Sequence, residues 1–279
     1  MTFRLLRLGA VVLGIFASAL GGEDARPVVD ASRIREERPV NPALPTLFLV
    51  GDSTVKSAGQ GGAYGWGERI APHFDPARIN VVNHAIGGRS SRTFLTEGRW
   101  ARTLAQVRAG DFIIIQFGHN DGGRIGDPAA KGRPSGRGTG PETVEDTRRD
   151  GTREQVHTFG WYLARYVEEG RAKGATVILA SPVPHRDRWE TGRDFADHAA
   201  WAAEVARKGG ALYFDLTLVV SAAYRRIGAE QVGTFFADRA THTNDAGARF
   251  NAACVVTGLR SLPGDPLGSY LVREAPAAP

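Results

Sequence analysis

The sequence is nearly free of cysteine, with Cys254 alone among 279 residues. One thiol excludes an intramolecular disulfide and a cysteine-based zinc site. Lysine and arginine form no long block and the net charge is only +5, so we expect no nucleic-acid partner. Hydrophobic residues at 42% and charged residues at 23% match soluble globular domains. This composition excludes disordered, fibrous and polytopic membrane proteins, and we expect no membrane partner.

A long apolar run occurs only near the start of the chain. Arg4 and Arg7 precede the apolar residues 8–20, which end at Ala17-Ser18-Ala19. This layout is typical of a secretory signal peptide. A membrane anchor or a buried helix is the alternative, but the run falls short of the roughly 20 residues that span a bilayer. We therefore predict a signal peptide at residues 1–20 and a secreted or periplasmic protein.

The rest of the chain has the length of one large α/β domain. Residues 21–44 are polar, contain proline and lack periodicity, which predicts a linker. The domain is predicted to span residues 45–262, followed by a C-terminal tail at residues 263–279. Glycine is abundant, with 35 residues against an average of about 7%, which favours many tight loops.

Short apolar runs alternate with segments of helical periodicity. Continuous apolar strands predict a parallel sheet that is covered on both faces. The predicted strands are residues 46–50, 79–82, 112–117, 175–180 and 211–214, and the predicted helices are residues 97–108, 153–172, 194–208, 217–227 and 245–260. This alternation predicts a three-layer α/β/α sandwich with a five-stranded parallel sheet, in which ligands bind beyond the carboxyl ends of the strands.

Residues 121–150 interrupt this rhythm. They are rich in Gly, Arg, Asp and Pro and carry no helix or strand pattern. A loop of this length is either functional or a surface decoration. Because it follows the third predicted strand, one interpretation places it beside the site.

Four segments at strand ends carry groups that suit acyl transfer. Ser53 follows the first strand and presents a hydroxyl nucleophile together with its own N–H. Gly88 lies in a Gly-Gly loop where a backbone N–H can reach a bound oxygen, and Asn120 supplies a side-chain N–H. Asp238 precedes His242 closely enough to orient its imidazole. Together they provide a nucleophile, three oxyanion donors, a base and an orienting acid.

Each segment also has an ordinary structural explanation. Ser53 suits a helix N-cap, the Gly-Gly pair suits a turn, and Asn244 suits the N-cap of the last helix. His119 is better explained as a buried structural histidine, because no second ligand stands at metal spacing. We expect neither a metal nor an organic cofactor.

As a set, the four segments resemble the sequence blocks of SGNH hydrolases, also called GDSL esterases, over about residues 45–260. The details are most similar to rhamnogalacturonan acetylesterases. The shared features are Gly-Asp-Ser-Thr at 51–54, Gly-Trp-Gly-Glu at 65–68, Gly-Arg-Ser-Ser-Arg at 88–92, Phe-Gly-His-Asn-Asp at 117–121, Trp-Glu-Thr-Gly at 189–192 and Thr-His-Thr at 241–243.

This resemblance implies a flavodoxin-like SGNH fold and a secreted serine esterase. Its catalytic triad would be Ser53, His242 and Asp238, and its oxyanion hole Ser53, Gly88 and Asn120. The implied substrate is an acetylated plant cell-wall polysaccharide, rhamnogalacturonan first. A broader esterase, lipase or thioesterase, a xylan acetylesterase, and a non-catalytic carbohydrate-binding relative are the alternatives. No G-x-S-x-G or early G-x-G-x-x-G occurs, which argues against an α/β-hydrolase and a Rossmann dehydrogenase.

The last block departs from the family pattern. The family spaces its acid and histidine as D-x-x-H, whereas Asp238 and His242 are separated by three residues. Either the loop bulges to absorb the extra residue, or a backbone carbonyl orients the imidazole and Asp238 assists.

Substrate contacts are predicted for Arg89, Trp66 and Trp189. Arginine suits a uronate carboxylate and tryptophan suits stacking on a sugar ring. Arg92, Arg99 and Trp100 are further candidates, and a purely structural role is the alternative for all six. We expect a monomer.

Overall fold

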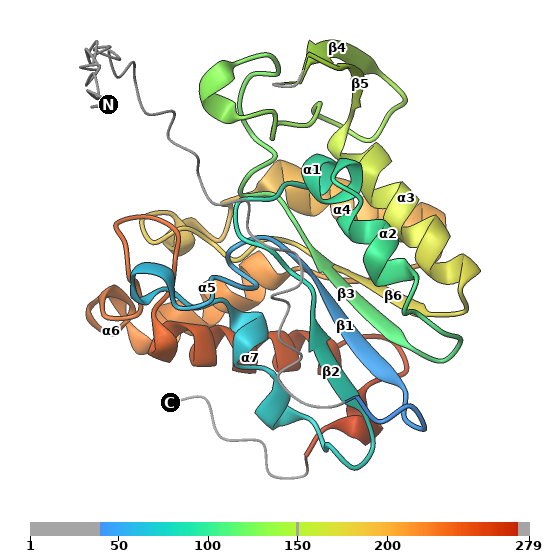
Figure 1. The fold of residues 1–279 in the computed structure, drawn as a ribbon. Helices are drawn as coiled ribbons and strands as arrows, with labels where there is room; N and C mark the ends of the chain where they lie inside the picture. Colours follow the sequence, from blue (N-terminus) through green and yellow to red (C-terminus); the bar gives the residue numbers. More distant parts are fainter. Residues whose placement is uncertain (1–39, 149–150, 273–279) are drawn as a thin grey trace, which may run out of the picture. The chain divides into compact units, whose positions relative to one another are not determined.

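A computed structural model describes residues 40–148 and 151–272, all within one compact unit, Glu36–Pro279. In this part of the chain five strands form a parallel sheet in the order β2-β1-β3-β6-β7 (Figure 1). The strands are β1 (Thr46–Gly51), β2 (Asn80–Asn83), β3 (Phe112–Gln116), β6 (Thr176–Ala180) and β7 (Leu212–Phe214). The predicted five-stranded parallel sheet is confirmed.

The strands are buried on both faces because their apolar side chains alternate between two cores. In β1, Leu47 and Leu49 belong to one core, whereas Phe48 and Val50 belong to the other. β1 pairs in register with β2 on one side and β3 on the other. A central strand with both faces buried reads as an unbroken apolar run, which is why the sequence revealed it.

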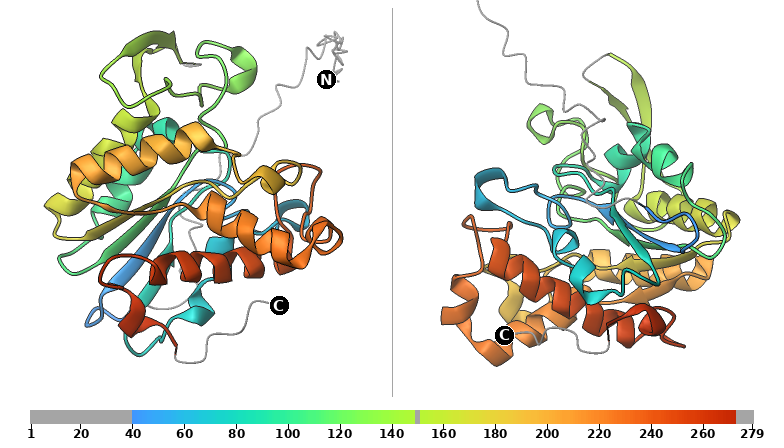
Figure 2. Two further views of the ribbon diagram at one scale, coloured as in Figure 1. Left: turned by 180° about the vertical axis from the view of Figure 1, so that it is seen from behind. Right: turned by 60° about the horizontal axis from the view of Figure 1, so that its bottom comes forward.

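Helices cover both faces of the sheet, giving three layers (Figures 1 and 2). One face is covered by α1 (Ser91–Thr96), α2 (Arg99–Leu104), α3 (Phe159–Ala172) and α4 (Ala196–Gly209). The other face is covered by α5 (Leu216–Ile227), α6 (Ala229–Gly233) and α7 (Asp245–Arg260). The start of α7 agrees with its expected N-cap, because the Asn244 side chain accepts a hydrogen bond from Gly247 N–H.

Two predicted helices and the structureless loop need correction. Residues 153–157 are not helical but form β5 (Arg153–His157), which pairs antiparallel with β4 (Thr143–Thr147) inside the segment expected to lack structure. The alternating polar residues of this hairpin gave no buried apolar run to detect. The helix predicted at 97–108 is shorter and is α2, while α1 precedes the predicted range; Gly98, at a φ of 69°, lies between the two helices.

The ends of the predicted domain also need correction. Leu267 and Leu271 of the expected C-terminal tail are buried in the core, and Leu271 forms a β-bridge with Phe74. At the other end, Asn41 of the expected linker exchanges hydrogen bonds with Asn80 of β2. Isolated apolar residues and a single polar pair form no periodic pattern, so the sequence did not reveal these contacts. The predicted signal peptide lies outside the described residues.

The single thiol lies inside α7, where Cys254 is 4% exposed. Burial raises the pKa of this thiol to about 12. Across residues 40–148 and 151–272, no helix has both the length and the apolar character needed to cross a bilayer.

Candidate active site

Ser53 lies on the turn that follows β1, and a buried chain of hydrogen bonds fixes this turn. The Asp52 carboxylate accepts hydrogen bonds from Thr54 N–H and from the Thr54 hydroxyl, at 2.8 and 2.7 Å. The amide of Gln116, at the end of β3, donates to Thr54 Oγ1 at 2.6 Å and accepts from the Trp66 indole at 2.8 Å. The side chains on either side of the nucleophile are therefore tied to the central strands.

His242 reaches Ser53 from the loop before α7. Its Nε2 lies 2.9 Å from Ser53 Oγ, and its Nδ1 lies 2.5 Å from Asp238 Oδ2. The three side chains form a continuous hydrogen-bonded row from residues 189 positions apart in the sequence. The structure thus brings together the predicted nucleophile, base and orienting acid.

The extra residue between Asp238 and His242 is absorbed by a hairpin-like loop. Ala237 N–H donates to the His242 carbonyl at 2.8 Å, and Phe236 bridges Thr243. Inside the loop, Asp238 Oδ1 accepts hydrogen bonds from the N–H groups of Ala240, Thr241 and His242. One carboxylate oxygen shapes the loop and the other holds the imidazole, which is the bulged alternative of the two predicted.

These contacts set the charge of Asp238. Burial raises its pKa, but the hydrogen bonds from the Thr241 N–H, the His242 ring and two further N–H groups outweigh it. The net result is a pKa well below the ordinary value of an aspartate. Asp238 is therefore ionised at neutral pH.

The Gly-Gly turn lies against Ser53, and the predicted donor Asn120 contacts the residue that follows this turn. A Cβ added to Gly87 would lie 3.5 Å from Ser53 Cβ, which places the Gly-Gly turn against the nucleophile. Gly88 has a φ of 74°, and nothing lies within 4 Å of where its Cβ would be. Asn120 Nδ2 donates to the Arg89 carbonyl at 3.2 Å. Within the described residues, the N–H groups of Ser53 and Gly88 have no protein acceptor.

The predicted tryptophan contacts are wrong. Trp66 is 1% exposed and Trp189 is 6% exposed, so neither ring offers a face to a sugar. Trp66 packs in the hydrophobic core, and Gln116 accepts the hydrogen bond of its indole N–H, so burial leaves no unpaired donor. Trp189 packs edge-on against Tyr224, and Trp100 is buried with its indole bonded to Glu169.

The three candidate arginines differ in environment. Arg92 is 1% exposed and binds the carboxylates of Asp146 and Glu154, so its guanidinium joins α1 to the β4–β5 hairpin. Arg89 remains partly exposed, with its guanidinium on Glu97 and on the Gly87 carbonyl. Arg99 shares Glu97.

Sequence reasoning missed a second aspartate–histidine pair. Asp52 is fully buried, and its Oδ2 lies 3.4 Å from Nδ1 of His119, which is also buried. Burial raises the pKa of Asp52, but His119 and the Thr54 hydrogen bonds lower it to a net value below the ordinary one. Asp52 belongs to the G-D-S motif and His119 to the G-H-N motif, but no sequence spacing predicts that the two side chains meet.

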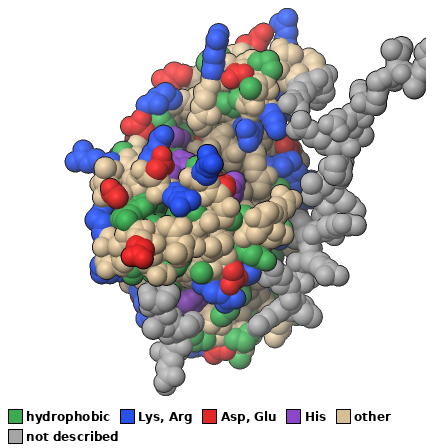
Figure 3. Space-filling view, turned by 90° about the vertical axis from the view of Figure 1, so that its left-hand side faces the viewer, with side chains coloured by type: hydrophobic (Ala, Val, Ile, Leu, Met, Phe, Trp, Pro, Cys, Tyr) green, Lys and Arg blue, Asp and Glu red, His purple; other side chains and the backbone are tan. Residues whose placement is uncertain are grey.

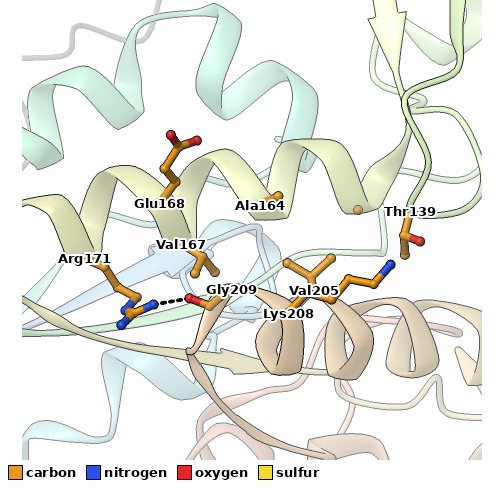
Figure 4. A pocket seen from close by; sticks show the side chains of 9 residues that line it. Thr139, Ala164, Val167, Glu168, Arg171, Val205, Lys208 and Gly209 are labelled. Carbon is orange, nitrogen blue, oxygen red and sulfur yellow. Dashed lines mark hydrogen bonds between the residues drawn. The ribbon is translucent and has the colours of Figure 1, made fainter.

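Two hollows lie outside this row of side chains. One, of 650 Å³, has a mainly polar rim of α1, residues 126–132 and the β4–β5 hairpin, and α1 begins two residues after Arg89. Another, of 450 Å³, lies between α3 and α4 and is lined by none of the predicted site residues (Figure 4). On the side of the molecule seen in Figure 3, histidine side chains reach the surface near both basic and acidic side chains.

Residues 49–250 match the sequence profile of the GDSL-like lipase/acylhydrolase family. The chain belongs to this family. A rhamnogalacturonan acetylesterase of Emericella nidulans is 35% identical over 73% of this GDSL-like chain and 80% of its own. A probable rhamnogalacturonan acetylesterase of Bacillus subtilis is 33% identical, over 82% and 98%.

Solved structures show the same fold. Protein YxiM of Bacillus subtilis superposes with a TM-score of 0.60 at 24% identity, over 78% of this chain and 56% of that one. An acetylxylan esterase of Geobacillus stearothermophilus superposes with a TM-score of 0.52 at 18% identity, over 77% and 93%. The family match and the two acetylesterase relatives make the GDSL-like chain a carboxylic ester hydrolase, and the superpositions show that it has the SGNH fold.

Proposed function

We propose that this GDSL-like hydrolase removes acetyl groups from a carbohydrate, with Ser53 as nucleophile, His242 as base and Asp238 as the group that orients the base. The observation that carries the proposal is the row Asp238–His242–Ser53, with its 2.5 and 2.9 Å contacts. Hydroxyl, imidazole and carboxylate in that order are the machinery of nucleophilic acyl transfer.

In this mechanism Ser53 Oγ attacks the acetyl carbonyl while His242 Nε2 takes its proton. Asp238 keeps the Nδ1 proton on the other side of the ring, so that Nε2 is free to accept. The tetrahedral intermediate collapses, and His242 returns the proton to the sugar alkoxide as the C–O bond breaks. Water then attacks the acetyl-enzyme by the same route and releases acetate.

The oxyanion would lie between the N–H groups of Ser53 and Gly88 and the side-chain amide of Asn120. Both backbone donors are unused within the described residues, and the positive φ of Gly88 turns its peptide in a way that a larger residue would resist. Donors held in place before the reaction stabilise the developing charge without reorganising.

Rhamnogalacturonan is the substrate that we propose first. It is supported by two relatives named for that activity at 35% and 33% identity over most of the chain. Arg89, partly exposed on the Gly-Gly turn, is the proposed contact for a uronate carboxylate. The polar hollow beside α1 offers further room for sugar hydroxyls. We also propose secretion or periplasmic export, from residues 1–20.

The test measures acetate release by the purified protein from acetylated rhamnogalacturonan, acetylated xylan and an aryl acetate. We expect Ser53→Ala to abolish release from all three while its thermal unfolding stays cooperative. Ser261→Ala is the matched control, because this serine caps the far end of α7. Turnover by Ser53→Ala would refute the nucleophile, and release from xylan but not from rhamnogalacturonan would refute the substrate.

A further inference from the structure

Arg133 lies in the long segment after β3 and contacts the proposed oxyanion donor directly. Its Nη1 donates to Asn120 Oδ1 at 3.1 Å, and its Nε donates to the Ala130 carbonyl at 3.0 Å. Within the described residues no carboxylate lies within ion-pair distance of this guanidinium, whereas Arg89 and Arg92 both have carboxylate partners. A positive charge therefore lies on the oxygen side of the Asn120 amide.

The two partners of Asn120 fix which way its amide points. A guanidinium has only donors, so the atom facing Arg133 must be the oxygen. A backbone carbonyl only accepts, so the atom facing Arg89 must be the nitrogen. With one N–H on Arg89, the second N–H of the Asn120 amide is the one left for a ligand. Without Arg133, the Arg89 carbonyl alone would hold the amide in this orientation.

The backbone around Arg133 is itself anchored. The carbonyl of Pro134 accepts a hydrogen bond from buried Arg92 at 3.0 Å. Ser135 is bound twice by Asp121, through its N–H to the carbonyl at 3.0 Å and through its hydroxyl to the carboxylate at 3.1 Å. Preceding a proline also restricts the backbone of Arg133. The backbone that carries the Arg133 side chain is thus held by these contacts, as preorganised sites require.

We infer that Arg133 is a positioning residue, which holds the Asn120 amide in its donor orientation and polarises it toward the oxyanion. A hydrogen bond from a cation to the amide oxygen draws electron density from the nitrogen and strengthens its remaining N–H as a donor. This inference rests on the proposed function. It gives the long segment after β3 a task in the reaction rather than in substrate binding.

A double-mutant cycle on a neutral aryl acetate tests this role, because a neutral substrate excludes direct charge attraction by Arg133. Arg133→Met should lower kcat about tenfold and change KM less than about twofold, a fraction of the 10²–10³ expected for Asn120→Ala. In the Asn120→Ala background the same substitution should have no further effect, because the group it acts through is gone.

Arg137→Met is the matched control. Arg137 lies in the same segment, but its guanidinium bonds Asp197 and stands 5.4 Å over the Trp201 ring. We expect wild-type kcat from this variant. Should Arg133→Met lose its near-UV circular dichroism, Arg133→Lys, which keeps the charge but not the fork of donors, carries the same cycle with an intermediate loss.

Equal losses in the presence and absence of the Asn120 side chain would overturn the inference, as would a raised KM with unchanged kcat. An equal loss in the Arg137 control would overturn it too, since it would point to general loosening of the segment. Failure of the proposed function is a different result, because there the wild-type enzyme itself would not cleave the acetate or Ser53→Ala would retain activity.

Discussion

Replacing Asp238 with asparagine separates the protonation of His242 from the shape of its loop. The asparagine oxygen can still accept the three backbone N–H groups that Asp238 Oδ1 accepts now, at 2.7–3.1 Å. The group facing His242 Nδ1 becomes an NH₂ donor instead of a carboxylate oxygen. Nδ1 must then accept, the proton moves to Nε2, and Nε2 can no longer take the proton of Ser53.

The expected loss in kcat is about 10³–10⁴, or roughly 4–5 kcal/mol in the barrier. The unfolding free energy should change by less than about 1 kcal/mol, because the loop keeps its acceptor. Asp238→Ala is the contrasting variant, since it removes both functions. We expect a similar kcat and a further loss of about 1–2 kcal/mol in stability, a low figure because the side chain is 44% exposed.

The assay is steady-state hydrolysis of an aryl acetate, with urea unfolding of each variant measured in parallel. Asp238→Asn with more than about a tenth of the wild-type kcat would refute the reasoning. It would mean that a backbone carbonyl, and not this carboxylate, orients the imidazole.

Three further substitutions test the scaffold. Gly65→Ala places a Cβ 2.2 Å from the backbone of the loop after Ser53, so we expect it to destabilise the fold by about 1–3 kcal/mol in urea unfolding. Gly122→Ala is the control, because its Cβ would meet nothing within 4 Å and the unfolding free energy should not change. Arg92→Met should cost about 3–5 kcal/mol, because the buried Asp146 carboxylate loses its ion-pair partner and Glu154 keeps only Arg148 within the described residues. Arg153→Met on the exposed hairpin should cost under about 0.5 kcal/mol. Burial, helped by the charge of a nearby lysine, lowers the pKa of His84 to about 4, so folding stability should fall by about 3 kcal/mol between pH 6.5 and 4 as the unfolded chain takes up the proton. His84→Gln should flatten that part of the pH–stability curve, and parallel curves would contradict the assignment.

The sheet and the position of the site could be predicted because both leave local signals. Buried parallel strands such as residues 112–116 are short apolar runs, and each predicted site segment directly follows a strand or precedes α7. Parallel strands end at one edge, so Ser53 and Asn120 had to lie near each other. The row that joins Ser53 to His242 is present in the structure, while the chemical roles of its members remain predictions.

What the sequence concealed depends on contacts between distant residues. The β4–β5 hairpin has polar strands and is held by buried Arg92 through Asp146 and Glu154, which a pattern of apolar residues cannot reveal. Tryptophan chemistry suits both a sugar platform and a core, and only the structure shows that Trp66 lies in the core with Gln116 as the acceptor of its indole N–H. The Arg133–Asn120 contact likewise needs the path of a segment without periodicity.

Cys254 offers a readout that requires no engineering. Cys254 lies within α7, in the hydrophobic core that also packs against the loop before this helix. Burial raises the pKa of the thiol and so suppresses its reactive thiolate form. A thiol reagent can therefore modify the folded protein only when that core opens. The rate at which a chromogenic disulfide labels this side chain would time those openings in every variant above, and would separate an enzyme that has lost a chemical group from one that spends longer unfolded.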